Sequence, residues 1–189
     1  LDLVLITHSH WDHFEPRAVR RALMPTTTVL GPPDVMRRLK GVQATTLWPA
    51  HGDGPEGPPI QVGPARVRSY RTTHGAQHSS FLLEVGGFRL FHDGDNEDTR
   101  TMSAQALGVI DVLMLCPWQG SGWAGFVQAL SPGRWILSHL SSEEIAAHAA
   151  GRFLPELCDQ IPLPERIVAL NPGETLVVQK PKSAPSTRA

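Results

Sequence analysis

This sequence has neither a segment that could cross a membrane nor an excess of charge of either sign. No apolar stretch approaches the ~20 residues needed to span a bilayer. Lysine and arginine total 17 against 18 acidic residues, the formal net charge is -1, and no long run of like charge occurs. This composition gives no support for nucleic-acid binding or for attachment to a membrane surface.

Cysteine is also scarce. The two cysteines, Cys116 and Cys158, are far apart and lack C-x-x-C spacing, so each is expected to be a small buried residue, not a ligand or half of a disulfide. With 41% hydrophobic and 19% charged residues, the 189-residue chain has an ordinary globular composition and suits one domain. We expect this domain to span residues 1–180, followed by a Pro-, Ser- and Lys-rich tail, 181–189, that is disordered.

Histidine, by contrast, is abundant, and four potential metal ligands occur close together. The segment Thr7-His8-Ser9-His10-Trp11-Asp12-His13 follows Leu1–Ile6, an apolar run that predicts a buried strand. The ligands therefore lie where a rigid strand ends and a loop begins, which can hold side chains firmly and leave them open to solvent. Imidazole and carboxylate groups at this H-x-H-x-D-H spacing predict a site for zinc, with manganese or iron as alternatives.

Three later segments place further potential ligands beside strand-like sequence. Two of them contain more than one candidate: His74 or His78 in the first, and Asp93 or Asp95 in the second. The three segments are Thr72–Ser80, Leu90–Asn96 and Ile136–Leu140, the last with His139.

Together these four segments resemble the signature of the metallo-β-lactamase superfamily, whose members carry such ligands in this order. The H-x-G-D form of residues 92–95 and the stretch Asn171–Thr175 are most similar to the branch that holds L-ascorbate-6-phosphate lactonase and related metal-dependent hydrolases. Members of the superfamily have further strands before the motif strand, whereas this chain begins directly with Leu1. We therefore expect the domain to be incomplete at its N-terminus. Any secretory signal would precede Leu1, so the sequence assigns no compartment, and it assigns no oligomeric state.

The resemblance implies a fold and a ligand set. The fold is α/β, an αββα sandwich of two mixed β-sheets packed face to face with helices outside. The ligand set holds two divalent metal ions. By matching, the first ion would be bound by His8, His10 and His74, the second by Asp12, His13 and His139, and Asp95 would bridge both.

Two of these assignments have a competitor within the sequence. His78 stands four residues after His74, but the position relative to the following strand favours His74. Asp93 competes with Asp95, and the H-x-G-D alignment favours Asp95. His92 is expected to support the site or to pack in the core, because metal ligands need hydrogen-bonding partners behind them.

The resemblance implies hydrolysis, in which a hydroxide bridging two metals attacks an ester, lactone or phosphodiester of a small substrate. Asp12 is the candidate catalytic proton acceptor. Trp11, inside the motif, and Trp118, in a glycine-rich loop after a strand, are the candidate substrate-binding residues. The alternatives are a non-catalytic metal-binding or scaffold domain and a metallo-nuclease. A structural zinc site needs only four ligands, and a nuclease is expected to carry a basic groove, so hydrolysis of a small molecule is favoured.

Elsewhere strand-like and helix-like segments alternate, which predicts a layered α/β fold. Gly86-Gly87 predicts a two-residue hairpin, which argues against a purely parallel sheet. The expected helices are 15–24, 33–39, 98–107, 124–130 and 142–152, the last with a capping box from Ser141 or Ser142 to Glu144. The expected strands are 27–30, 43–48, 65–73, 80–85, 88–92, 111–115, 135–138, 166–170 and 174–179.

Overall fold

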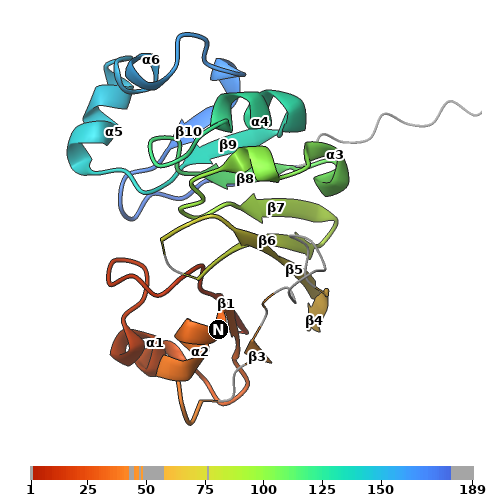
Figure 1. Ribbon diagram of the computed structural model, residues 1–189. Helices are drawn as coiled ribbons and strands as arrows, with labels where there is room; N and C mark the ends of the chain where they lie inside the picture. The colour runs from red at the N-terminus through yellow and green to blue at the C-terminus, as the bar shows by residue number, and fades with distance from the viewer. Residues whose placement is uncertain (1, 43–44, 47, 49–57, 76, 180–189) are drawn as a thin grey trace, which may run out of the picture.

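Two β-sheets face one another between two outer layers of helices (Figure 1), as a computed structural model of the chain shows. The structure describes residues 2–42, 45–46, 48, 58–75 and 77–179. The expected α/β sandwich is confirmed. The expected disordered tail, 181–189, lies outside the described residues, as does His51, which the glycine- and proline-rich sequence around it predicts to be exposed.

The smaller sheet is built from the motif strand and the two strands that follow it. Its strands pair in parallel in the order β1 (Leu3–Leu5), β2 (Thr28–Gly31) and β3 (Thr45–Thr46). Side chains alternate along β1, so that Val4 packs toward α1 (Pro16–Ala22) and α2 (Pro33–Arg38), while the leucines on either side of it face the other sheet. Helix α1 begins as the sequence predicts, with a proline in its first turn and the Glu15 carboxylate accepting from its first backbone N–H groups.

The larger sheet is mixed, in the order β10-β9-β8-β7-β6-β5-β4. Neighbours from β4 to β7 pair antiparallel, and neighbours from β7 to β10 pair in parallel. The turn between β6 and β7 is the predicted hairpin: Gly86 and Gly87 have φ of 56° and 80°, which a type I′ turn requires at both positions. The seven strands are β4 (Ile60–Val62), β5 (Ala65–Thr72), β6 (His78–Val85), β7 (Phe88–His92), β8 (Val112–Leu115), β9 (Arg134–Leu137) and β10 (Ile167–Ala169).

Helices cover the outer face of the larger sheet and enclose the main core. Phe91, Leu113 and Trp135 are fully buried there, and the Trp135 ring packs 5.8 Å from that of Trp123. The helical segments of this half are η1 (Thr99–Thr101), α3 (Ala104–Leu107), α4 (Trp123–Leu130), α5 (Ser142–Ala149), α6 (Phe153–Leu157) and η2 (Pro164–Arg166). No helix in the described part of the chain is both long and apolar enough to span a membrane.

A smaller apolar cluster joins the two sheets. Leu30 of β2 packs against Val67 of β5 and Phe81 of β6, all three almost fully buried. Near this cluster the backbone N–H of Ser79 donates to the carbonyl of Thr7 at 2.8 Å. The loop that carries the histidine motif is therefore fixed directly to the start of β6.

Three expectations for regular structure need correction. The strand expected at 174–179 is wrong: after a turn in which the Glu174 carboxylate accepts from the Asn171 N–H, residues 174–179 form no β-structure and pair with no strand. The helix expected at 98–107 is two short ones, since Asp98 and Ser103 each cap a separate start. The helix expected at 142–152, α5, ends at Ala149, and its capping box from Ser141 to Glu144 is confirmed. It is followed by a separate helix, α6, which no sequence pattern indicated.

Replacing Phe91 by alanine should destabilise the fold by about 3–5 kcal/mol, because its buried ring packs between Tyr70 and Phe126 and would leave a cavity. Urea denaturation followed by circular dichroism measures the change. Val109→Ala is the matched control, since Val109 is 77% exposed and its loss should change stability by less than about 0.5 kcal/mol. Equal losses in the two variants would contradict the core assignment.

Candidate metal centre

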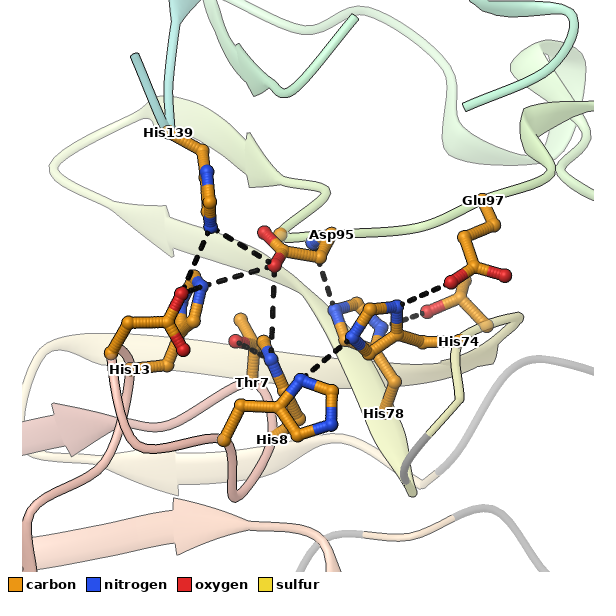
Figure 2. Close-up of polar contacts among 12 residues, drawn as sticks. Thr7, His8, His13, His74, His78, Asp95, Glu97 and His139 are labelled. Atoms are coloured by element: carbon orange, nitrogen blue, oxygen red, sulfur yellow. Dashed lines mark hydrogen bonds and ion pairs between the residues drawn. The ribbon is translucent and has the colours of Figure 1, made fainter. Parts of the chain in front are cut away.

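Four loops converge at one edge of the sandwich and bring the predicted ligands together (Figure 2). One loop follows β1, and the others follow the carboxyl ends of β5, β7 and β9. These three strands run in the same direction in the larger sheet, so their carboxyl ends meet at the same edge. The residues supplied by the loops form three overlapping groups, His8/His10/His74, His8/His13/Asp95 and Asp12/His13/His139, and within each group the ligand atoms lie within 4.8 Å of one another.

The first group is centred on His8, which is completely buried. Its Nδ1 lies 3.0 Å from the hydroxyl of Thr7. On the exposed side, Nε2 of His74 lies 3.1 Å from Nδ1 of His10. Three imidazoles from two sheets thus meet at one point.

The second ligand group, which consists of Asp12, His13 and His139, lies on the other side of His8. Nε2 of His139 is 3.3 Å from Oδ2 of Asp12, and the rings of His13 and His139 stack with centroids 4.9 Å apart. His139 has φ of 61°, in the left-handed region that is uncommon for a residue other than glycine. Such backbone conformations persist where the surrounding structure enforces them, and they cluster at functional sites.

Asp95 lies between the two groups. Its Oδ2 is 3.7 Å from Nε2 of His8, 3.0 Å from Nε2 of His13 and 3.5 Å from Nε2 of His139. Asp93, two residues earlier, turns away into the protein, where it is 1% exposed and accepts hydrogen bonds from Ser80. The structure thus brings Asp95 to the cluster and keeps Asp93 out of it.

One buried atom of the cluster favours a bound cation. Nε2 of His8 is buried and has no hydrogen-bond partner among the described residues. Leaving a buried polar atom unpaired is costly, and a metal ion would satisfy its lone pair. The other members of the cluster are imidazoles and carboxylates, which suit zinc and related divalent cations.

The protonation states also fit a metal centre. Burial, followed by the charge of His13, lowers the pKa of His8 to about 3, so this imidazole is neutral at pH 7, as a ligand must be. Burial alone would raise the pKa of Asp95, but its hydrogen bond to His13 holds it below the usual range. Asp95 is therefore an anion in the middle of the histidines. Burial raises the pKa of Asp93 to about 7.

His78 is placed behind the cluster, where it supports Asp95. Its Nε2 accepts a hydrogen bond from the backbone N–H of Asp95 at 3.0 Å, which requires the ring proton on Nδ1, 2.7 Å from the hydroxyl of Thr72. Both ring nitrogens are thus engaged within the protein. Gly94 allows this approach: its φ is 59°, and a Cβ there would lie 2.6 Å from Nε2 of His78.

Glu97 is a functional candidate that sequence reasoning missed. Its carboxylate lies 2.9 Å from Nδ1 of His74 (Figure 2). Nε2 of that ring then faces Nδ1 of His10. Carboxylates commonly orient histidine ligands in this way. The only signal in the sequence is its position directly after the Asp93–Asn96 segment, and nothing there indicates that its partner is His74. His92, as expected, supports the site from behind, its Nδ1 accepting from the N–H of Gly94.

An open pocket of about 720 Å³ lies beside the second ligand group. Trp118 forms part of its wall, and its indole N–H donates to the carbonyl of His139 at 3.0 Å. Trp11 is 89% exposed and is not one of the residues that line this pocket. The structure therefore places one of the two predicted substrate-binding tryptophans beside the candidate centre's pocket.

The chain matches one protein-family model in sequence and several solved structures in fold. The model for the beta-lactamase superfamily domain matches residues 1–138, and no curated protein matches the sequence. The metallo-beta-lactamase fold protein YhfI from Bacillus subtilis has a TM-score of 0.61 at 15% identity, covering 90% of this chain and 75% of that one. A diphosphatase from the PhnP family has a TM-score of 0.59 at 16% identity, covering 95% and 72%. The short form of human tRNase Z has a TM-score of 0.55 at 15% identity, covering 76% and 74%. At these identities the likeness to solved structures shows the fold alone.

Replacing Glu97 by alanine should weaken binding of a divalent cation by about 10–100-fold, because His74 would lose the carboxylate that orients it. Competition with a chromophoric zinc chelator measures the affinity. Glu156→Ala removes an exposed carboxylate of helix α6 and serves as the control, with no change expected. An unchanged affinity in Glu97→Ala would show that His74 does not depend on this contact.

Proposed function

The chain belongs to the beta-lactamase superfamily, and from this premise we propose that it is a metal-dependent hydrolase with a dinuclear centre. One observation carries the proposal. A single carboxylate oxygen, Oδ2 of Asp95, faces both of the flanking ligand groups, so a cation in either group would lie beside it. A purely structural zinc site closes its coordination with four ligands, whereas this cluster offers seven.

The proposed ligand assignment follows the geometry. His74 is proposed as a ligand in preference to His78, because both nitrogens of His78 are hydrogen-bonded behind Asp95. Asp95 is proposed as the bridge in preference to Asp93, whose carboxylate is turned into the core. The first ion would be held by His8, His10 and His74, and the second by Asp12, His13 and His139.

Zinc is the favoured metal, with manganese or iron as alternatives, because nitrogen and oxygen ligands suit all three. Two such ions, when bound, supply an activated water molecule near neutral pH and polarise the bond to be cleaved. The protein's own part is to position the groups around that reaction. The side chain of Asp12 borders the pocket and is the proposed proton acceptor, and Trp118 is the proposed substrate contact.

The proposed substrates are small esters, lactones or phosphodiesters. The H-x-G-D segment and Asn171–Thr175 keep the branch of L-ascorbate-6-phosphate lactonase as the favoured comparison. A nuclease is less favoured, because the chain has no excess of basic residues to neutralise a phosphate backbone. A non-catalytic metal-binding domain is also less favoured, because the cluster opens on a pocket instead of being closed by ligands.

Protein purified without added metal should contain about two divalent ions per chain by inductively coupled plasma mass spectrometry. The double change His8→Ala with His10→Ala should release at least one ion, because it removes two of the three side chains in the first group. His148→Ala, which alters a histidine of α5 outside these groups, is the control and should keep both ions. A metal content near zero that the double change leaves unaltered would overturn the dinuclear centre.

Asp95→Asn should lower the metal content and abolish turnover, because two cations would lose the charge that compensates their repulsion. Asp93→Asn is the matched substitution two residues away and should have a smaller effect on both. Metal content is measured on folded protein, with circular dichroism as the check. A fully loaded and active Asp95→Asn protein, or loss of metal from Asp93→Asn alone, would reverse the assignment.

A further inference from the structure

The pocket beside the second ligand group is lined by two kinds of residue. The first kind comprises the proposed ligands Asp12, His13 and His139. The second kind comprises residues to which the proposed function assigns no metal, namely Trp118, Leu140, Ser141 and Glu144. A substrate whose reacting bond lies at the metal centre would therefore have this second set available for the rest of its structure.

The charged residues of the pocket are all acidic. Asp12 and Glu144 contribute carboxylates, and no lysine or arginine is among the described residues that line it. Arg38 contacts the motif loop, where it donates to the carbonyl of Ser9, but it does not line the pocket. A substrate that carries a negative charge away from its reacting bond would find no cationic side chain here to offset that charge.

The start of helix α5 already carries a carboxylate. The N-terminus of a helix ordinarily attracts anions through its free N–H groups. Here the Glu144 carboxylate accepts from the N–H of Ser141 at 2.7 Å, and the Ser141 hydroxyl accepts from the N–H of Glu144 at 3.2 Å. The capping box thus uses two of the N–H groups at this helix start and adds a negative charge there.

The remaining surface is apolar. Trp118 is 41% exposed, and its N–H is already used by the carbonyl of His139, so the exposed part offers ring carbon atoms. Leu140 adds an aliphatic side chain beside it. Burying hydrocarbon on such a surface is favourable, whereas burying a charge without a partner is costly.

We propose that the substrate is a carboxylic ester or lactone that is uncharged outside its reacting group and whose apolar group contacts Trp118 and Leu140. This inference rests on the proposed hydrolase function and narrows it against substrates that are charged outside the reacting group, such as phosphorylated lactones. The reaction is balanced by water alone. The water oxygen bonds to the carbonyl carbon, the bond from that carbon to the ester oxygen breaks, and the ester oxygen leaves as an alcohol carrying one of the water protons.

The test uses the metal-loaded protein and four nitrophenyl substrates: p-nitrophenyl acetate, p-nitrophenyl hexanoate, mono-p-nitrophenyl adipate, whose acyl chain ends in a carboxylate, and bis(p-nitrophenyl) phosphate. The three carboxylic esters share a leaving group, so their kcat/KM ratios report the contribution of the acyl chain. We expect the hexanoate to be preferred over the acetate by about 10-fold or more, mainly through KM, and to exceed the adipate in kcat/KM. Trp118→Ala should abolish the preference for the hexanoate, whereas Trp118→Phe, which keeps an aromatic ring but loses the N–H, should retain it.

Glu144→Gln removes one of the two carboxylates from the pocket and keeps an oxygen for the cap. It should raise the ratio of kcat/KM for the adipate to that for the hexanoate several-fold. A higher kcat/KM for the adipate or for the diester than for the hexanoate would overturn this inference and leave the proposed hydrolase standing, as would a chain-length preference that Trp118→Ala does not alter. Absence of metal-dependent turnover of all four substrates would overturn both.

Discussion

The candidate ligands are arranged around one carboxylate, that of Asp95. Its Oδ2 lies within 3.7 Å of three histidine nitrogens, two from the loop after β1 and one from the loop after β9. The backbone N–H of Asp95 donates to His78, which can approach only because residue 94, just before Asp95, is glycine. The larger sheet matters to function chiefly because it fixes this peptide relative to the loops around it.

Much of the arrangement could be predicted from local sequence, because the relevant signals act over a few residues. The glycine pair specifies its hairpin through positive φ, and Ser141 with Glu144 specifies a helix start through reciprocal hydrogen bonds. The full ligand set, by contrast, is named through the resemblance of four segments to the metallo-β-lactamase signature, and the fold brings those residues together. Their assignment to particular ions stays a prediction.

The parts that could not be predicted depend on contacts between distant segments or on competition between local ones. The pairing of Glu97 with His74 requires two loops to meet, and no pattern in either loop specifies the other. His78 supports the site by accepting a hydrogen bond from the backbone N–H of Asp95, which lies 17 residues later in the chain. In the segment 98–107 two capping residues compete, so a single helical pattern gives two short helices.

The contribution of both sheets to the cluster has a mechanical consequence. Three of its histidines, His8, His10 and His13, follow a strand of the smaller sheet. The candidate ligands His74, Asp95 and His139 follow strands of the larger sheet. A cation held among them would act as a clamp across the seam between the sheets, beside the backbone contact from Ser79 to Thr7. Any sliding of one sheet past the other would then change the coordination distances. Substitutions of residues that pack between the sheets, such as Leu30 and Phe81, would then change the metal affinity although these residues are not among the candidate ligands.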